Sequence, residues 1–495
     1  MDKNFFLTTT LPYVNAPLHM GHALEFVRAD TIARYKKLLG YDVYFNTGTD
    51  EHGVKNYQKA QEKNISPQEF VDQGFNIFIE QLKMFGVDES IMHFIRTTDK
   101  KHEMIARDFW RVVDKNGYIY KKSYKAKYCV GCESEKTDSE LIEGTCPHHP
   151  NQELKTIDEE NYFFKYSLFG DKLLKLYENN PNFVVPDFRL NEVKNFVNGG
   201  LQDFSISRLK EKMPWGIEVP GDPSQVMYVW FDALTNYIST LADDETETIE
   251  ELVQGENFKK YWINGNPTQY CGKDNTRFQG AMWQAMLMAS NIPNSHQIVV
   301  NGFITGEGGI RMSKSLGNGV DPKEIVNEYG TDALRYFLLR EIASFEDSPF
   351  TKERFHESYN SGLANGLGNL TSRILTLSEK YIPLPNLPIT KGEEKEGVYL
   401  LPSEFINYLE NYDLQKAVSF IWEKIAELDK RIQETEPFKV IKIDEEKGKE
   451  LIKENVVKLY EISQMLIPIL PETAKRLDIL IRENRKPEAP LFLRK

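Results

Sequence analysis

Residues 4–26, NFFLTTTLPYVNAPLHMGHALEF, decide the fold of this 495-residue chain. The segment from Asn4 to Thr10 predicts a short buried strand. Apolar residues then recur at helical spacing from His22 to Leu39, and Gly40 supplies a helix stop. YDVYFNT, residues 41–47, predicts a second strand. A strand, a helix and a second strand in this order imply a parallel sheet with a right-handed crossover.

The rest of the chain divides into regions of different character. Between about Tyr118 and Pro223, lysines, cysteines and prolines interrupt the pattern, and strand patterns return at 225–231, 268–272 and 297–300. We therefore predict an α/β protein whose Rossmann-like, doubly wound sheet is split by an insertion and followed by an all-helical domain. The predicted domains are the two sheet halves 1–117 and 225–300, the insertion 118–224, a mobile loop and stem-contact region 301–350, and the helical domain 351–495, with a connecting loop at 383–396.

Composition narrows the class of protein. The net charge of −13 argues against a protein that coats nucleic acid non-specifically. No run approaches the 18 apolar residues of a membrane span, and the N-terminus has neither signal-peptide nor transit-peptide character. The four cysteines are too few for a disulfide framework. These features predict a protein of the reducing cytoplasm.

The first chemical motif is PLHMGH, residues 17–22. It lies between the first predicted strand and the first helix, where free backbone N–H groups and the helix dipole favour a phosphate. His19 and His22 can both face that position, and Gly21 allows a ligand to approach the backbone. A capped loop with incidental histidines is the simpler interpretation of the motif taken alone.

The second motif is GEGGIRMSKSLGN, residues 306–318, which carries Arg311 and Lys314 on a glycine-rich loop. Such a loop can close on a pyrophosphate leaving group and stabilise the charge that develops there. Taken alone, however, the segment is better interpreted as a flexible basic surface loop.

A metal site is predicted in the insertion. Cys129 and Cys132 form one knuckle, and Cys146 and His149 form a second with the same two-residue gap. This pattern fits a closed, tetrahedral structural Zn²⁺ site. His148 is the alternative fourth ligand.

Together, HMGH and RMSKS resemble the HIGH and KMSKS signatures of class I aminoacyl-tRNA synthetases, and the chain resembles the methionyl-tRNA synthetase family over nearly its whole length. The resemblance is carried by LPYVNAPLHMGH, GTDEHG, YVWFDALTNY, CGKDNTRF, the cysteine-bearing insertion and NGLGNLTSR. It implies a methionine–tRNA ligase that forms methionyl-adenylate and pyrophosphate from L-methionine and ATP. The methionyl group then passes to the 3′-terminal adenosine of tRNA(Met), initiator tRNA included. The implied cofactors are ATP, Mg²⁺ with the ATP, and one structural Zn²⁺.

The resemblance also assigns roles to residues. The implied catalytic residues are His19, His22, Arg311 and Lys314. The implied ATP-binding residues are His19, Gly21, His22, Gly272, Lys273, Asp274 and Lys314. The implied methionine-binding residues are Leu11, Tyr13, Asp50, Trp230, Leu234, Tyr237, Asn275, Phe278 and Gln279, and Arg208 is expected to help close the site. Asp50 suits the substrate amino group, and aromatic rings suit a thioether.

In the helical domain, Asn369 and Arg373 lie four residues apart and share a helix face, and they resemble the family's anticodon-reading pair. Phe438 stands where the family has a stacking Trp, and it is either a stacking platform or a core residue at a helix end. The chain departs from the family's pattern at two further positions. Arg311 replaces the first Lys of KMSKS, and Gln279 replaces the family's usual His.

Three rival functions remain. Another class I synthetase is disfavoured because the insertion is too short for a large editing domain and YVWFDALTNY favours methionine. A small HxGH nucleotidyltransferase would not need the helical domain and the zinc insertion. A non-catalytic tRNA-binding scaffold would not need intact His19, His22 and Lys314. Because the chain ends soon after the helical domain, we expect a monomer.

Overall fold

The computed structural model describes residues 3–132, 134–136, 141–310, 319–383 and 401–495. A six-stranded parallel sheet lies at the centre, with the strand order β3-β2-β1-β12-β13-β7. Its strands are β1 Asn4–Thr8, β2 Asp42–Thr49, β3 Met92–Arg96, β7 Val184–Val185, β12 Thr268–Gly272 and β13 Gln297–Asn301. The predicted strand–helix–strand unit is confirmed, with α1 at Met20–Leu38 between β1 and β2. The strand order changes direction between β1 and β12, where open α/β sheets bind ligands.

Alternating side chains of the central strands enter two different cores. In β1, Phe5 and Leu7 belong to one core, whereas Phe6 belongs to the other. Val299 in β13 joins the first core, and its neighbours join the second. Since successive side chains point to opposite faces of a strand, a continuous apolar run supplies both faces of a sheet covered by helices.

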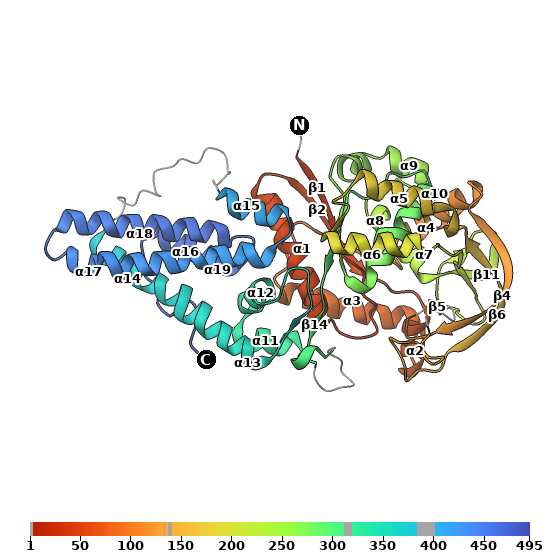
Figure 1. Cartoon of the computed structure of the whole chain (residues 1–495), viewed down its shortest axis with the longest axis horizontal. Helices are drawn as coiled ribbons and strands as arrows, with labels where there is room; N and C mark the ends of the chain where they lie inside the picture. Colours follow the sequence, from red (N-terminus) through yellow and green to blue (C-terminus); the bar gives the residue numbers. More distant parts are fainter. Residues whose placement is uncertain (1–2, 133, 137–140, 311–318, 384–400) are drawn as a thin grey trace.

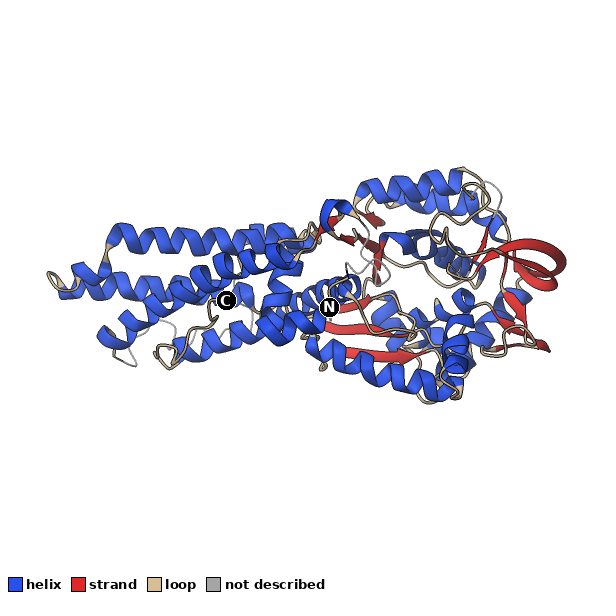
Figure 2. Ribbon diagram, turned by 90° about the horizontal axis from the view of Figure 1, so that it is seen from below, coloured by secondary structure: helices blue, strands red, loops and turns tan. Residues whose placement is uncertain are grey.

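Each face of the sheet has its own helices (Figures 1 and 2). The first core contains residues of α1, α3 and α12 and continues into the C-terminal helices. The second contains residues of α4, α5, α6 and α8 to α10. The helices of this part of the chain include α2 Val54–Glu62, α3 Pro67–Met84, α4 Lys100–Lys115, α5 Gly170–Asn179, α6 Asp187–Asn198, α8 Asn236–Ser239, α9 Ile249–Gln254, α10 Trp283–Ala289, α11 Pro322–Tyr329 and α12 Thr331–Arg340.

The insertion forms antiparallel sheets at one end of the molecule (Figure 1). One sheet has the order β5-β4-β6-β8 and another β10-β11-β9. The strands are β4 Ile119–Cys129, β5 Ser134–Lys136, β6 Lys155–Phe164, β8 Phe204–Ser205, β9 Ser207–Leu209, β10 Glu218–Val219 and β11 Asp222–Met227, while β14 Ile304–Thr305 pairs with β15 Ser348–Pro349 elsewhere. Strand β7, although inside the range 118–224, is the edge strand of the central parallel sheet. The domain boundaries themselves stay predictions.

The strand predicted at 225–231 is only partly correct. Strand β11 ends at Met227, and the chain turns into helix α7, Val229–Ala233. Tyr228 N–H donates to the Ile206 carbonyl at 2.7 Å, so the last sheet-like contact lies at the helix start. A short apolar run such as VWFDAL is compatible with either a buried strand or a buried helix, and here tertiary packing selects the helix.

The C-terminal region is helical and extends away from the sheet (Figure 1). Its helices are α13 Lys352–Ser358, a π-helix Tyr359–Gly368, α14 Asn369–Tyr381, α15 Ser403–Glu410, α16 Leu414–Thr435, α17 Pro437–Val440, α18 Glu445–Leu466 and α19 Pro471–Arg482. The prediction of a helix over 414–434 is confirmed, and most of 383–396 lies outside the described residues. Arg335 joins this region to α1, because its guanidinium contacts Asp30 at 2.7 Å and the Ile469 carbonyl at 2.9 Å.

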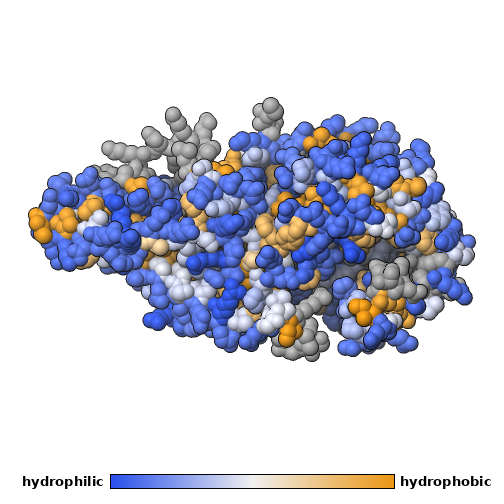
Figure 3. Space-filling view, viewed as in Figure 1, coloured by the Kyte–Doolittle hydropathy of each residue, from blue (hydrophilic) through white to orange (hydrophobic). Residues whose placement is uncertain are grey.

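The visible surface is mainly hydrophilic, with scattered apolar side chains (Figure 3). None of the helices in the described part of the chain has the length and low polarity that crossing a bilayer requires.

Candidate active site and zinc centre

The predicted catalytic and binding residues gather where the central strands end. The histidine motif follows β1, Asp50 follows β2, and the Gly272 turn follows β12. The chain after β13 leads to the loop that carries Arg311 and Lys314, and both of these residues lie outside the described residues. Residues far apart in sequence therefore meet at one edge because parallel strands align their carboxyl ends there.

His19 and His22 form a stacked pair at the start of α1, with ring centroids 3.8 Å apart. His19 is the N-cap residue and its Nδ1 accepts from Gly21 N–H at 3.1 Å, while His22 Nδ1 accepts from His19 N–H at 3.2 Å. In the neutral rings, each proton is therefore on Nε2, where it can be donated to a phosphate. Burial and the nearby His19 hold the pKa of His22 well below its usual value, which favours that neutral form.

Gly21 lies close to the His19 ring. A Cβ at Gly21 would lie 3.0 Å from Cε1 of the His19 ring. A side chain at this position would require the His19 ring to shift slightly, and glycine avoids that shift.

Glu25 is a buried acid beside this site that the sequence did not single out. Its Oε1 accepts from Thr10 N–H at 2.8 Å and from the Thr10 hydroxyl at 2.6 Å. Burial raises the pKa of Glu25 to about 7 despite the hydrogen bonds from Thr10, and the charge of Asp274 acts in the same direction as burial. The side chain thus ties the chain after β1 to the first turns of α1.

Asp50 lies in the segment after β2 and is 3% exposed. It pairs with Tyr13 in an isolated parallel bridge, and its N–H donates to the Pro12 carbonyl at 3.0 Å. Asn56 Nδ2 donates to the Asp50 carbonyl at 3.1 Å. These contacts fix the backbone of both predicted methionine-binding residues against each other.

Asp232, within YVWFDALTNY, forms a buried network that the sequence did not reveal. Its two carboxylate oxygens contact His52 Nδ1 at 2.7 Å and His102 Nε2 at 2.8 Å. Burial opposes charge on Asp232, but the two histidines outweigh it and lower the pKa of the carboxyl. For His52, burial acts to lower the pKa, and the Asp232 carboxylate outweighs it and raises the pKa. The network holds α7, which carries Trp230, against α4.

Aromatic and amide side chains form the predicted methionine-binding wall. Trp230 stacks on Phe278 with centroids 4.0 Å apart and an interplanar angle of 5°. Leu234, Tyr237 and Gln279 are buried, whereas Leu11 and Asn275 are partly buried. Gln279 Nε2 donates to the Tyr237 hydroxyl oxygen at 2.5 Å.

The turn with the predicted ATP-binding residues Gly272, Lys273 and Asp274 lies at the end of β12. Asp274 is exposed, and a Cβ at Gly272 would lie 2.9 Å from Asp274 Oδ1. Lys273 Nζ forms an ion pair with Asp347 Oδ2 at 2.6 Å and lies 4.3 Å from the centroid of the Phe303 ring. Asp347 Oδ1 in turn accepts from Phe303 N–H at 2.9 Å.

Arg208 joins the insertion to the catalytic sheet region. Its guanidinium donates to Ser205 Oγ at 2.6 Å and to the Ser207 carbonyl at 2.7 Å. It also lies over the rings of Tyr128 and Tyr228, at 5.2 and 5.1 Å. Tyr128 precedes the zinc ligand Cys129, so Arg208 links the two regions.

The four predicted zinc ligands form one cluster, with all ligand atoms within 4.8 Å of one another. Cys132 Sγ lies 3.4 Å from Cys146 Sγ and 3.3 Å from His149 Nδ1. Separations of this size fit ligands about 2.0–2.3 Å from one tetrahedral Zn²⁺. His148 is exposed and outside the cluster, so His149 is the histidine that would serve as the fourth ligand.

Gly131, between the first two ligands, explains part of this geometry. A Cβ there would lie 2.4 Å from Cγ of His149. The glycine leaves room for the histidine to reach the cluster. With four protein ligands no position is left for a substrate, which makes the site structural.

The predicted anticodon residues lie on the helical domain. Asn369 is exposed at the start of α14, and Arg373 forms an ion pair with Asp429 of α16. Phe438 in α17 is 39% exposed. That exposure favours the stacking interpretation over the core interpretation.

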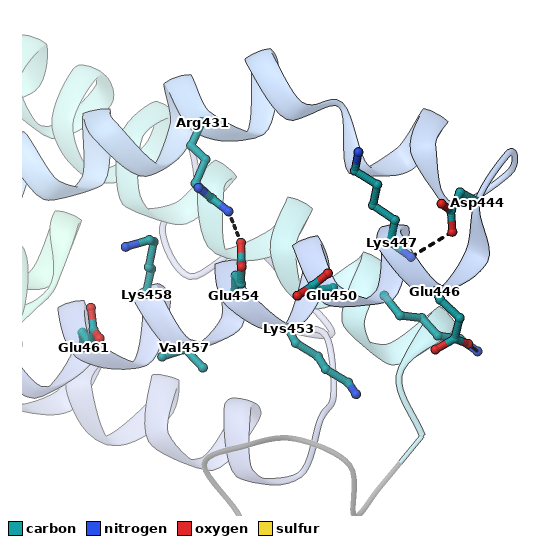
Figure 4. Close-up of a pocket in the computed structure, with 11 residues that line it drawn as sticks. Arg431, Asp444, Glu446, Lys447, Glu450, Lys453, Glu454, Val457, Lys458 and Glu461 are labelled. Carbon is teal, nitrogen blue, oxygen red and sulfur yellow. Dashed lines mark hydrogen bonds and ion pairs between the residues drawn. The ribbon is translucent and has the colours of Figure 1, made fainter.

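A groove of about 920 Å³ lies in the helical domain and differs from the sheet edge in composition (Figure 4). Five basic and five acidic side chains line it together with Val457; they are Arg431, Lys447, Lys449, Lys453, Lys458, Asp444, Glu446, Glu450, Glu454 and Glu461. Many of these charges can pair with each other, as Arg431 and Glu454 do. We interpret the groove as a solvated face of α16 and α18.

Comparisons with known proteins agree with this geometry. Residues 5–159 and 151–375 match the family described as tRNA synthetases class I (M). The chain is 42% identical to the methionine–tRNA ligase of Caldanaerobacter subterraneus subsp. tengcongensis, over 96% of this chain and 74% of that protein. It is 37% identical to the methionine–tRNA ligase of Thermotoga maritima, over 98% and 76%. Its structure is similar to that of Mycobacterium tuberculosis methionyl-tRNA synthetase in complex with methionyl-adenylate, with a TM-score of 0.86, 33% identity and coverage of 97% of this chain and 94% of that one.

Proposed function

The chain belongs to the methionine–tRNA ligases of the class I tRNA synthetase family, and we propose that it activates L-methionine with ATP and transfers it to tRNA(Met). The products of the first step are methionyl-adenylate and pyrophosphate. The observation that carries the proposal is the gathering of the histidine pair, Asp50 and the Gly272 turn at the carboxyl edge of one parallel sheet.

The first step needs positioning and charge stabilisation more than a general base. The methionine carboxylate attacks the α-phosphate of ATP, and pyrophosphate leaves. His19 and His22 present Nε2–H donors at the positive end of α1, where phosphate oxygens are favoured. Arg311 and Lys314 are proposed to stabilise the leaving pyrophosphate. Mg²⁺ bound with the ATP would offset phosphate charge.

Methionine recognition combines one charge with an apolar wall. Asp50 is proposed to bind the ammonium group, and the stacked Trp230 and Phe278 to enclose the thioether side chain. Gly272, Lys273 and Asp274 are proposed to bind the ATP ribose. For that, Lys273 would exchange its contact with Asp347 for the nucleotide.

The tRNA is proposed to contact the helical domain through Asn369, Arg373 and Phe438. The exposed ring of Phe438 can stack on an anticodon base, at about 1–3 kcal/mol per base. Initiator tRNA shares the methionine anticodon and is an expected substrate. We expect the protein to act in the cytoplasm. We also expect it to be a monomer, which sedimentation would test.

Amino-acid-dependent ATP–pyrophosphate exchange tests the first step. Methionine should support exchange, whereas leucine, valine, isoleucine and cysteine should not. Exchange with a different amino acid would preserve the reaction class and reject the specificity. No exchange with zinc-loaded, folded protein would favour the scaffold alternative.

Charging of tRNA(Met) tests the second step. Phe438→Ala should raise the KM for tRNA by about tenfold, because a stacking contact of about 1.4 kcal/mol is lost. Methionine-dependent exchange without tRNA should not change. Phe438→Trp, which keeps a ring, should charge as the wild type does.

A further inference from the structure

The chain from Asp50 to Gly53, which we call the ammonium segment, leads from β2 into α2 and is buried. It contains the carboxylate that is proposed to bind the methionine ammonium group. Asp50 N–H donates to the Pro12 carbonyl at 3.0 Å, and Glu51 N–H donates to Thr97 Oγ1, just after β3, at 2.9 Å. Buried backbone groups need such partners, and the partners fix the conformation of the chain. The position of the Asp50 side chain therefore depends on the elements that supply them.

Trp215 supplies two further partners, and it belongs to the insertion. Its indole Nε1–H donates to the Glu51 carbonyl at 2.7 Å, and its own carbonyl accepts from Gly53 N–H at 3.3 Å. Its ring also packs against the His52 ring, with centroids 5.4 Å apart and an interplanar angle of 59°. Trp215 thus contacts the three consecutive residues that follow Asp50.

The loop that carries Trp215 is fixed within the insertion. It connects β9 to β10. Before the tryptophan, Met213 N–H donates to the Leu209 carbonyl at 3.0 Å. After it, Met227 N–H donates to the Ile217 carbonyl at 2.7 Å. The loop is therefore held by β9 on one side and by β11 on the other.

Strand β9 also connects Trp215 with the zinc centre. Arg208 in β9 lies over the Tyr128 ring at 5.2 Å, and the next residue, Cys129, is one of the four clustered zinc ligands. A continuous set of contacts leads from the zinc cluster through β9 and the Trp215 loop to the ammonium segment. The insertion thus reaches the predicted methionine site at its charged end.

Loss of the indole N–H would leave a buried carbonyl without this donor. Glu51 is 0% exposed, so water cannot easily replace the indole. A buried acceptor without a partner costs free energy, and the peptide between Glu51 and His52 would rotate to find another donor. Because that peptide follows Asp50 directly, its rotation would shift the carboxylate as well.

We propose that Trp215 is a positioning residue for methionine and holds the Asp50 carboxylate where the substrate ammonium group binds. The inference rests on the proposed function and gives the insertion a part in the first step of the reaction. The ammonium contact is the same in the ground state and in the transition state. Its weakening should therefore raise the KM for methionine and leave kcat unchanged.

Trp215→Phe tests the proposal, because it keeps a ring and removes the indole N–H. In ATP–pyrophosphate exchange by the whole, zinc-loaded chain, the KM for methionine should rise about 3- to 10-fold, the range of one net hydrogen bond. The kcat and the KM for ATP should stay within about twofold of the wild type. An unchanged KM for methionine would overturn the proposal.

Trp422→Phe is the matched control. Trp422 Nε1–H donates to the Gly362 carbonyl at 3.1 Å in the helical domain, so the substitution removes the same kind of hydrogen bond far from Asp50 in the fold. It should leave the KM for methionine unchanged. A rise equal to that in Trp215→Phe would mean that general destabilisation causes the effect, and the proposal would fail.

A second measurement separates positioning of Asp50 from a merely structural role. Methionyl sulfamoyl-adenosine, a stable analogue of the adenylate, and its des-amino counterpart differ only in the ammonium group. Trp215→Phe should raise the Kd of the first about 3- to 10-fold and that of the second by less than about twofold. Equal weakening of both ligands would overturn the proposal. Should Trp215→Phe not fold, Trp215→Tyr removes the same N–H and takes its place.

The two proposals fail in different ways. Wild-type protein without methionine-dependent exchange would reject the proposed function. Wild-type exchange, together with a Trp215→Phe variant that treats both adenylate analogues alike, would reject the role of Trp215 alone.

Discussion

The zinc cluster and the carboxyl edge of the central sheet are built in opposite ways. All four zinc ligands lie between Cys129 and His149, and a glycine between two of them gives the histidine its space. The sheet edge instead combines residues from His19 to Asp274, and two cores are needed to hold its strands in order. A metal organises the first region locally, whereas long-range packing organises the second.

This difference has a consequence for stability and activity. Disturbing the zinc cluster should affect the insertion and leave the central sheet folded. Changing a side chain at the sheet edge should affect chemistry or local charge and leave the zinc in place. One treatment and three variants test this separation. The expected free-energy change is largest for removal of zinc and smallest for Asp232→Asn.

Removal of zinc should have the largest effect. A chelator would withdraw a contribution of about 10 kcal/mol or more from the insertion. Amide protons of β4 and β6 should then exchange rapidly, while those of β1 and β12 stay protected, as hydrogen-exchange mass spectrometry would report. Cys132→Ala should copy this result, and His148→Ala, outside the cluster, should retain one zinc per chain. Equal loss of protection in β1 would contradict a local role.

His22→Ala should affect chemistry far more than stability. Loss of one preorganised donor at a developing charge costs about 3–4 kcal/mol, so the kcat of methionine-dependent exchange should fall about 100- to 1000-fold. Zinc content should match the wild type, and the thermal midpoint should fall only slightly, because the acceptor for His19 N–H in the cap of α1 is lost. A fall of less than about tenfold would remove His22 from the proposed catalytic set.

Glu25 should make stability depend on pH. Its pKa is raised by burial to about 7 in the folded protein, against 4.5 for the ordinary side chain. The folded state then holds the proton more tightly, so stability should decrease as pH rises from 4.5 to about 7, by about 3 kcal/mol in total. Glu25→Gln should remove this slope in urea unfolding of the substrate-free protein. Glu62→Gln, at an exposed acid, should leave it unchanged.

Asp232→Asn should give the smallest change of the four, a destabilisation of about 2–3 kcal/mol from weakened contacts to two buried histidines. Because the carboxylate raises the pKa of His52 against the effect of burial, the network stabilises most below pH 6.5 and loses that part as pH rises through the folded pKa. The variant should therefore differ most from the wild type near pH 6. Urea unfolding near pH 6 would measure this difference in the free energy of unfolding. If Asp232 were uncharged in the native protein, the wild type would not be more stable than the variant at that pH.

Much of the fold could be predicted because its patterns are local. The strands at 4–10, 268–272 and 297–300 and the helix at 414–434 are confirmed within one to three residues at their ends. The prediction of a strand at 225–231 is partly wrong, because an apolar run of that length has no periodicity that distinguishes a strand from a helix. Strand β7 has only two residues, Val184 and Val185, and no sequence pattern of that length identifies an edge strand.

The same contrast applies to the candidate site. The histidine motif, Asp50, the Gly272 turn and the zinc ligands were predicted from motifs. Glu25, the network of Asp232 with His52 and His102, and the hydrogen bond from Gln279 to Tyr237 were not. Their residues are ordinary in sequence, and each acquires its chemistry from a partner on another element.

The sequence alone determined the parallel-sheet class, the three cysteines of the zinc site and the residue types at the sheet edge, because periodicity and short spacings are properties of neighbouring residues. Only the tertiary structure decided that His149 rather than His148 joins the cluster, that Phe438 is exposed, and that Gln279 donates to Tyr237. Burial, pKa and hydrogen-bond direction depend on groups that folding brings together from separate elements of the chain. They are therefore not encoded in any local stretch.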